Sequence, residues 1–323
     1  MANILKLGIV GNGRIAKRFA SEAKYVDGVL LQSIFGRNEE HIKSFCNDYG
    51  LINYYTNYEK FLDSVDAVYV ATPHKTHYDF AKKAILAKKH VLCEKPMVLT
   101  KNEAEELYDL AEYNSVILQE AIKTAYAPGF SELINVAKSG IIGEIKDISA
   151  TFTKLVLDKN LREYDKSAGG GCCTELGTYP LCPIVKLFGT DYKNLRFACF
   201  TDSETHVDYY TKINIEYKNS MATATVGIGV KKEGDMVIAG TLGYIYVPAP
   251  WWKTEYFEIR HENVSDVQKF YKKFEGDGLR YELSEFLCAI NTHKNSCLFT
   301  KQESIFVAEI MEHFINYRDK ITD

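Results

Sequence analysis

Long hydrophobic runs and blocks of like charge are both missing from this sequence of 323 residues. No apolar segment approaches the roughly 20 residues that a membrane-spanning helix needs, and the N-terminal residues are too polar for a secretory signal peptide. The 39 basic and 43 acidic residues give a net charge of −4 and form no basic stripe. The sequence therefore argues against a membrane anchor and a nucleic-acid partner, and predicts a soluble, cytoplasmic protein.

The sequence also lacks the C-x-x-C motif, to which none of its eight cysteines belongs. Most of them lie in apolar segments, where a free cysteine behaves as a small hydrophobic residue. Cys172, Cys173 and Cys182 are close together in the sequence, but no histidine lies near them. We therefore expect no metal site.

Internal repeats and low-complexity linkers are absent too, so the length suggests two ordinary domains. In the first part of the chain strand and helix patterns alternate, which favours a parallel sheet. A capping-box sequence at Thr100–Glu103 predicts a helix that runs to about Tyr113. The expected strands are Ile4–Val10, Val29–Phe35, Ala67–Ala71, His90–Cys93 and Val116–Gln119.

The second half is rich in strand patterns that partly alternate between apolar and polar residues, as in a sheet with one covered face. Helices are expected over Arg280–Ile290 and after a second capping box at Thr300–Glu303. We interpret Trp251 and Trp252 as packing residues, with a substrate or interface loop as the alternative. The expected strands are Lys146–Leu155, Leu195–Thr201, Tyr209–Tyr217, Ala222–Val230, Met236–Ala239 and Tyr244–Val247.

The segment Gly11–Ala16, with the sequence Gly-Asn-Gly-Arg-Ile-Ala, directly follows the first expected strand. Gly11 and Gly13 lack the Cβ atoms that would prevent a sharp turn and a close approach to a pyrophosphate, and small Ala16 lets the next helix pack close to the strand. That helix would point its free amide groups and positive dipole end at the phosphates. A purely structural turn is the alternative. The segment predicts dinucleotide binding by Gly11, Asn12, Gly13, Arg14 and Ile15.

The end of the second strand discriminates between cofactors in dinucleotide sites, because it reaches the adenosine ribose. An acidic residue there would bind the 2′-hydroxyl, but the chain has Arg37 and Asn38, with no acid before Glu39. Arg37 would form a charge-assisted bond to a 2′-phosphate, which favours NADP and leaves NAD possible. The alternatives are a solvated arginine, or one that stacks on adenine without preference.

Two polar segments follow the third and fourth strands, at the carboxyl edge where open α/β sheets bind ligands. Lys95 follows a buried strand and precedes a proline that restricts its backbone, so we expect it beside the nucleotide. The alternative is a loop lysine paired with Glu94. The cofactor-binding candidates in these segments are Thr72, Pro73, His74, His77, Glu94 and Lys95.

Together these motifs resemble the glucose-fructose oxidoreductase, inositol dehydrogenase and MocA (Gfo/Idh/MocA) family. The resemblance implies an α/β fold with an N-terminal Rossmann domain, a doubly wound parallel sheet, over residues 1–121. It implies a C-terminal α/β substrate-binding domain, with a large open and mostly antiparallel sheet, over residues 122–323. The motifs that carry it are Gly11–Ala16, Ala71–Pro73 with His77, Glu94–Pro96, Glu120–Ala121 with Pro128, Ile142–Ile145 and Gly169–Gly171.

Within the family, Arg162–Asp165 and Gly169–Pro180 are similar to the branch of dimeric dihydrodiol dehydrogenases and NADP-linked xylose dehydrogenases. This branch has a tyrosine, here Tyr179, where inositol dehydrogenases have histidine. Two positions depart from the family pattern, because Glu175 stands where aspartate is usual and His74 stands where asparagine is common. The resemblance implies that Lys95 lies near the nicotinamide. The expected substrate contacts are Lys95, Arg162, Glu175 and Tyr179.

The predicted activity is hydride transfer between a nicotinamide cofactor and a secondary alcohol or carbonyl of a sugar, polyol or dihydrodiol. As hydride leaves an alcohol its hydroxyl proton must be removed, and tyrosine, with an ordinary pKa of about 10, is a poor base at neutral pH. We predict that Lys95 holds the substrate oxygen and lowers the pKa of Tyr179, the general acid/base. Glu175 would orient Lys95 or a second hydroxyl group.

Other assignments stay open at this point. Lys95 itself could carry the proton, with Tyr179 as a positioning group or a buried structural residue. The chain could also be a non-catalytic nucleotide-binding regulator, or a glycoside-cleaving enzyme that uses bound NAD transiently.

The expected strand at Ala222–Val230 bears on assembly. Apolar Ala222, Ala224, Val226 and Ile228 alternate there with Thr223, Thr225 and Gly227. If the second face of this sheet is exposed, two copies that pair about a twofold axis would bury it. We therefore expect a homodimer or homotetramer formed through the C-terminal sheet.

Overall fold

The computed structural model describes residues 4–322 and divides the chain into two compact units, each built from two segments. The first unit contains the residues up to Tyr126 and the segment Glu275–Ser304. The second contains Ala127–Phe274 and the residues from Ile305 onward. The sequence suggested continuous domains that meet after residue 121, and this boundary stays a prediction.

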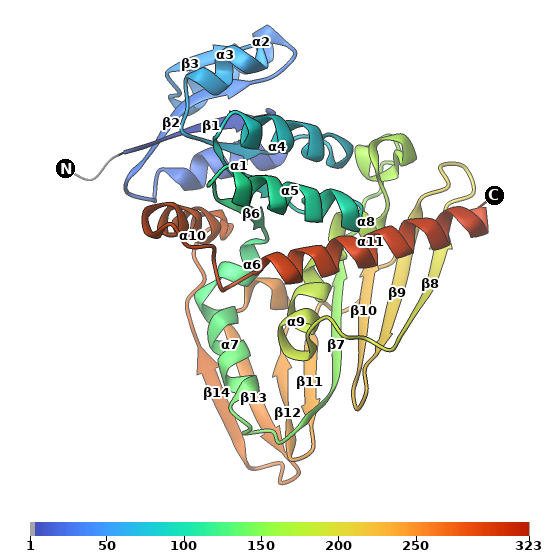
Figure 1. The fold of residues 1–323 in the computed structure, drawn as a ribbon. Helices are drawn as coiled ribbons and strands as arrows, with labels where there is room; N and C mark the ends of the chain where they lie inside the picture. The colour runs from blue at the N-terminus through green and yellow to red at the C-terminus, as the bar shows by residue number, and fades with distance from the viewer. Residues whose placement is uncertain (1–3, 323) are drawn as a thin grey trace. The chain divides into compact units, whose positions relative to one another are not determined.

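The first unit is built on a six-stranded, fully parallel sheet with strand order β3-β2-β1-β4-β5-β6 (Figure 1). The order reverses between β1 and β4, as in doubly wound dinucleotide-binding sheets, and confirms the expected fold class. β6 begins two residues later than expected, and the three-residue β3 is too short to give a sequence pattern. The strands are β1 (Leu5–Val10), β2 (Val29–Phe35), β3 (Asn53–Tyr55), β4 (Ala67–Val70), β5 (His90–Glu94) and β6 (Leu118–Ala121).

Several helices of this unit begin at a capping side chain. Asn38 accepts a hydrogen bond from the His41 N–H, and Thr100 accepts one from the Glu103 N–H, which confirms the helix predicted after Thr100. The helical segments are α1 (Arg14–Ala23), α2 (Glu39–Tyr49), α3 (Tyr58–Asp63), η1 (His74–Thr76), α4 (His77–Leu86), α5 (Lys101–Tyr113), α6 (Lys123–Tyr126) and α10 (Leu279–Thr292).

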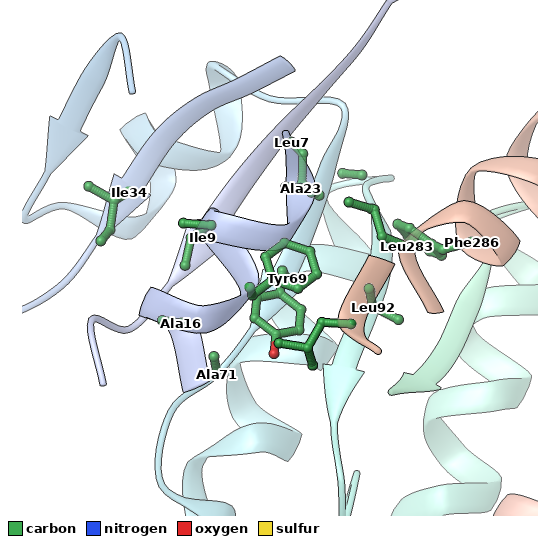
Figure 2. Close-up of a cluster of buried hydrophobic side chains, with 14 of the residues drawn as sticks. Leu7, Ile9, Ala16, Ala23, Ile34, Tyr69, Ala71, Leu92, Leu283 and Phe286 are labelled. Carbon is green, nitrogen blue, oxygen red and sulfur yellow. The ribbon is translucent and has the colours of Figure 1, made fainter. Parts of the chain in front are cut away.

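A buried hydrophobic cluster joins the sheet to α1 and α10 (Figure 2). Tyr69 of β4 stacks on Phe19 of α1, with ring centroids 3.6 Å apart. Leu283 and Phe286 of α10 lie in the same cluster as Leu92 of β5. The distant segment Glu275–Ser304 therefore supplies part of the core of the first unit.

The second unit contains an eight-stranded sheet with the order β14-β13-β12-β11-β7-β10-β9-β8. Its pairs are antiparallel except for β7 with β10, so the expected mostly antiparallel sheet is confirmed. The last two strands were not expected, because charged and polar side chains interrupt their apolar residues. The strands are β7 (Ile145–Thr153), β8 (Asn194–Thr201), β9 (Asp208–Glu216), β10 (Met221–Gly227), β11 (Met236–Gly240), β12 (Gly243–Val247), β13 (Tyr256–His261) and β14 (Val267–Tyr271).

The helical segments of the second unit include α8 and α9, which pack against β7, β9 and β10. The last helix, α11, begins with the expected capping box: the Thr300 N–H donates to Glu303 over 2.7 Å, and the Glu303 N–H donates back to Thr300 Oγ1 over 3.3 Å. α11 (Lys301–Thr322) begins in the last residues of the first unit and continues in the second. The other segments are α7 (Pro128–Lys138), η2 (Arg162–Tyr164), η3 (Lys166–Ala168), α8 (Cys172–Leu176), α9 (Thr178–Phe188) and η4 (Trp251–Lys253). Across residues 4–322 we find no helix with the length and apolar character that crossing a membrane requires.

Candidate active site

The turn between β1 and α1 has the geometry that a bound pyrophosphate requires. Gly11 has a φ of +101°, and a Cβ atom on it would lie 2.7 Å from the carbonyl oxygen of Ala71. A Cβ atom on Gly13 would meet nothing within 4 Å among the described residues, so the backbone faces open space there. The first turn of α1 has no side-chain cap and no acidic residue. These features fit a dinucleotide phosphate at the positive end of the α1 dipole.

Arg37 is exposed and lies two residues after the end of β2, where the sequence predicts the ribose contact. The neighbouring Asn38 uses its side chain to cap α2, and Glu39 lies in the first turn of that helix. A carboxylate in a first turn is favoured by the helix dipole. Arg37 is therefore the first charged side chain after the strand, and its contact with a cofactor stays a prediction.

His77 connects the two polar segments at the carboxyl edge of the sheet. Its Nδ1 lies 2.9 Å from the carbonyl oxygen of Pro96, and its Nε2 lies 2.8 Å from that of Thr72. His74 is also buried and packs edge-on against His77, with ring centroids 5.7 Å apart. The structure thus brings together the segments that follow β4 and β5, and it does so through buried histidines. The proposed cofactor contacts of His74, His77, Thr72 and Pro73 stay predictions.

Glu94 ends β5 as a buried carboxyl group beside the half-buried Lys95. Tyr69 Oη donates to Glu94 Oε1 over 2.5 Å, and the Lys95 N–H donates to Oε2 over 3.2 Å. Burial raises the pKa of Glu94, while the ammonium groups of Lys95 and Lys123 and the hydrogen bond from Tyr69 oppose the rise. Glu94 is therefore positioned by Tyr69 and the backbone of Lys95.

Glu120 of β6 is a second buried acid in this unit. It accepts hydrogen bonds from the Met97 N–H, over 3.0 Å, and from Ser304 Oγ. Burial raises its pKa to about 7, although these two hydrogen bonds oppose the rise. Sequence reasoning gave Glu120 no chemical role, because nothing in a single sequence marks which acid a strand will bury.

Arg162 and Glu175 form an ion pair in the second unit. Arg162 Nη2 lies 2.9 Å from Oε1 of Glu175 and donates a hydrogen bond to Oε2 over 3.0 Å. Glu175 lies on α8 and is only 9% exposed, whereas the Arg162 side chain keeps 35% of its surface exposed. The structure therefore joins two of the residues that the sequence predicts as substrate contacts.

The glycine segment Gly169–Gly171 packs against Asp208, the first residue of β9. Gly171 has a φ of +124°, and a Cβ atom there would lie 2.1 Å from Asp208 Oδ1. Asp208 is fully buried, accepts a hydrogen bond from the Cys173 N–H over 2.7 Å and pairs with Arg318 at 3.3 Å. Cys172 Sγ lies 3.0 Å from Asp208 Oδ2, so both cysteines belong to this structural cluster.

Tyr179 lies half-buried in the first turn of α9, beside an aromatic stack. Its ring centroid is 4.9 Å from that of Phe152, and Phe152 stacks face to face on Trp252 with centroids 3.6 Å apart. Trp251 is fully buried and donates from Nε1 to the carbonyl oxygen of Thr151 over 2.7 Å. Trp251 is thus a packing residue, whereas Trp252 extends the aromatic surface next to Tyr179. Sequence reasoning missed this stack because its members are far apart in the chain.

Comparisons with known proteins agree with this fold. Residues 5–122 match the model "Oxidoreductase family, NAD-binding Rossmann fold", and residues 130–246 match the model "GFO/IDH/MocA C-terminal domain". The trans-1,2-dihydrobenzene-1,2-diol dehydrogenase of Danio rerio is 25% identical over 318 residues, which cover 95% of each chain. The scyllo-inositol 2-dehydrogenase (NADP(+)) of Bacillus subtilis (strain 168) is 26% identical over 327 residues, which cover 96% of this chain and 95% of that protein.

A solved structure has a similar fold over nearly the whole chain. A 3-ketoreductase from Actinomadura kijaniata, in complex with NADP and TDP-benzene, matches with a TM-score of 0.85 and covers 96% of both chains. Its sequence is 22% identical, so this likeness concerns the fold.

Proposed function

Since this chain belongs to the Gfo/Idh/MocA family of oxidoreductases, we propose that it uses NADP to interconvert a secondary alcohol and a carbonyl on a sugar, polyol or dihydrodiol. As a family member it is an NAD(P)-dependent oxidoreductase that acts on CH–OH and C=O groups. The observation that carries the assignment is the Gly11–Gly13 turn, whose glycines and uncapped helix start fit a dinucleotide phosphate. The regulatory and glycoside-cleaving alternatives lack support of this kind, because the relatives named above are dehydrogenases and a ketoreductase.

The preference for NADP is supported by Arg37. Its guanidinium follows β2, and Glu39, the nearest acid in the sequence, belongs to the start of α2. A planar guanidinium forms strong charge-assisted hydrogen bonds to phosphate oxygens. The name of the Bacillus subtilis relative also specifies NADP. NAD remains a usable cofactor in this proposal, because the pyrophosphate turn does not distinguish the two.

The acid/base role is proposed for Tyr179, assisted by Lys95. When bound, the nicotinamide supplies the hydride acceptor or donor. Lys95 would hold the substrate oxygen, and its ammonium group at ~4 Å would favour a phenolate by up to ~4 kcal/mol at an effective dielectric constant of about 20. That interaction would bring the pKa of the tyrosine towards neutrality. In the competing assignment Lys95 carries the proton and Tyr179 positions the substrate.

Substrate recognition is proposed for the second unit. The Phe152–Trp252 stack offers an aromatic surface next to Tyr179, which suits the C–H face of a ring. Arg162 and Glu175 offer a donor and an acceptor for hydroxyl groups, while each fixes the other. An apolar surface with a few fixed polar groups is the usual composition of a small-molecule site. This combination supports a hydroxylated ring as substrate.

A homodimer or homotetramer is proposed through the C-terminal sheet. Ala222, Ala224 and Val226 of β10 are buried on the face that α8 and α9 cover, while on the other side Thr223 is half-buried and Thr225 is buried. The same outer side of the sheet carries Asn214, whose Oδ1 lies 3.0 Å from Thr223 Oγ1. Pairing two such faces about a twofold axis would bury a broad surface. Light scattering at micromolar concentration tests the proposal, and a monomer would rule it out.

A cytoplasmic location is proposed as well. All eight cysteines are free thiols, and five of them are buried. Reducing compartments keep thiols in this state. Cell fractionation with a compartment marker provides the test.

The function can be tested with the purified protein, NADP or NAD, and a panel of sugars, polyols and dihydrodiols. A net change in nicotinamide absorbance with one class supports the dehydrogenase. Glycoside cleavage without a net change would support the glycoside-cleaving alternative, and cofactor binding without any turnover would support the regulator. Lys95→Met is the matched control, because it should abolish the absorbance change and leave cofactor binding measurable.

A further inference from the structure

The ion pair of the proposed substrate site lies on two segments that meet at a pair of glycines: Arg162 belongs to η2 and Glu175 to α8. The Gly171 N–H donates to the carbonyl oxygen of Glu163 over 2.9 Å, and the Glu175 N–H donates to the carbonyl oxygen of Gly171 over 3.1 Å. Gly170 packs against η2, because a Cβ atom on it would lie 2.7 Å from the Arg162 carbonyl oxygen. The backbone of the two glycines therefore sets how η2 and α8 lie relative to each other.

Helix α8 begins without a capping side chain of its own, because its N-cap residue is Gly171. Asp208 of β9 takes that place, since its Oδ2 accepts a hydrogen bond from the Cys173 N–H over 2.7 Å. Thr211 Oγ1 and Cys172 Sγ each donate to the same oxygen over 3.0 Å. A Cβ atom on Gly171 would lie 2.1 Å from Asp208 Oδ1, so only a glycine there lets a carboxylate from the sheet reach the start of the helix.

Arg318 of α11 connects this carboxylate to the glycines. Its Nη1 lies 3.3 Å from Asp208 Oδ1 and donates to the carbonyl oxygen of Gly170 over 3.2 Å. The side chains of Arg318 and Asp208 are only 5% and 0% exposed. Burying two charges is costly, and apolar residues of similar volume often stabilise a fold as well or better. Packing alone therefore does not explain this pair, whereas its directional contacts explain it as a means of fixing the glycine backbone.

We propose that Asp208 and Arg318 are positioning residues for the substrate site. They hold the glycine backbone and the start of α8, so that Glu175 meets Arg162. This inference rests on the substrate role proposed above for that ion pair. All four residues belong to the second unit, so cofactor binding by the first unit should not respond to them. A loosened backbone misplaces substrate contacts without removing an acid/base group, so KM should change more than kcat.

Asp208→Asn is the test variant, because asparagine keeps the shape of the side chain but offers one acceptor oxygen where aspartate has two. That oxygen can serve the Cys173 N–H or Arg318, but not both. KM for the best substrate of the panel should rise about 5- to 20-fold, while kcat stays within about threefold and NADP affinity is unchanged. Glu216→Gln, at the other end of β9 in a partly exposed ion pair, is the matched control and should leave both constants unchanged.

A double-mutant cycle separates positioning from general packing. Glu175→Gln should itself raise KM, and in its background Asp208→Asn should raise KM by less than about twofold further, because the contact that it positions is already lost. Two results would overturn the proposal. One is an equal rise of KM from Asp208→Asn in both backgrounds, and the other is an unchanged KM for Asp208→Asn while Glu175→Gln raises KM.

The backbone has a readout that needs no turnover. Amide hydrogen exchange at Gly170–Glu175, without substrate, should be faster in Asp208→Asn than in wild type and unchanged in Glu216→Gln, whereas unchanged exchange in Asp208→Asn would overturn the proposal. If exchange responds but neither Glu175→Gln nor Asp208→Asn changes KM, the substrate role of the ion pair is wrong, although its positioning stands. If Asp208→Asn does not fold, Arg318→Lys, which keeps a cation but not the guanidinium, replaces it in both measurements.

Discussion

One guanidinium nitrogen of Arg162 lies within 3.0 Å of both carboxylate oxygens of Glu175. The family usually has aspartate at position 175, whose arm is shorter by one C–C bond, about 1.5 Å. In this chain the glutamate reaches the Arg162 guanidinium with both oxygens. The two residues also link η2 to α8, on opposite sides of the glycine segment that Asp208 holds.

Arg162→Gln should lower kcat/KM by about 5- to 150-fold, because it leaves Glu175 buried without its cation, at a cost of about 1 to 3 kcal/mol. NADP affinity should be unchanged, since the pair belongs to the second unit. Steady-state kinetics and cofactor titration provide the measurement. Arg196→Gln is a matched control, because Arg196 is 69% exposed in its pair with Glu216 and surface ion pairs contribute little. A similar loss of activity in both variants would contradict the role given to Arg162.

Arg37→Ala should weaken NADP binding by roughly 1.5 to 3 kcal/mol, the usual value of a hydrogen bond to a charged group, and leave NAD binding nearly unchanged. Fluorescence titration with both cofactors gives the two affinities. Arg18→Ala, at an exposed position of α1 in the same unit, controls for a general loss of positive charge. An equal loss of affinity for NADP and NAD in the Arg37 variant would contradict the hypothesis.

Local chemistry explains which parts of the fold the sequence could predict. The strand at Leu5–Val10 is a nearly continuous apolar run that ends in two glycines, and this combination has few other structural solutions. Thr100–Glu103 and Thr300–Glu303 specify helix starts through contacts within four residues. The segment Glu275–Ser304 carries no comparable local sign that it joins the first unit, because that membership depends on packing against residues far away in the chain.

The candidate site divides in the same way. The motif around Lys95 could be recognised because its residues are consecutive. Arg162 and Glu175 could be predicted as substrate contacts only through a family resemblance, and their ion pair was not predicted. The Glu94–Tyr69 contact and the carboxyl group of Glu282 could not be predicted. The first joins β4 to β5 and the second lies on α10, and burial alone decides whether a glutamate is a solvated surface residue or a perturbed acid.

Tyr179→Phe removes one oxygen atom and little volume, so NADP binding should be intact. Turnover should fall by the 10²- to 10⁴-fold that is typical of lost acid/base catalysis. Single-turnover kinetics with the best substrate of the panel provide the measurement. Tyr113→Phe is the control, because Tyr113 is 88% exposed at the end of α5.

The competing assignment predicts a different pair of results. If Tyr179→Phe loses less than about tenfold while Lys95→Met abolishes turnover, the lysine carries the proton and the tyrosine positions the substrate. Tyr179→Phe should keep its cofactor affinity in either case.

Glu120→Gln should change how stability depends on pH. The Glu120 carboxyl has a pKa of about 7 in the folded chain against an ordinary 4.5, because burial disfavours its ionised form. At a pH below both values it is protonated in both states and has no effect. Between them the unfolded chain gives up the proton while the folded chain keeps it, so the free energy of unfolding falls as pH rises. Above both values the loss is roughly 3 kcal/mol.

Glutamine cannot ionise, yet it can still accept from the Met97 N–H and contact Ser304. The free energy of unfolding of the variant should therefore equal that of wild type at about pH 4 and exceed it at about pH 8. Urea unfolding of the first unit provides the measurement. Glu106→Gln is the control, because hydrogen bonds from Lys82 and Tyr78 lower the pKa of that exposed acid. Its ionisation therefore stabilises the folded chain as pH rises, opposite to the effect of Glu120. If Glu120→Gln gave the same stability difference at both pH values, Glu120 would be ionised in the folded chain and its hydrogen bonds would outweigh its burial.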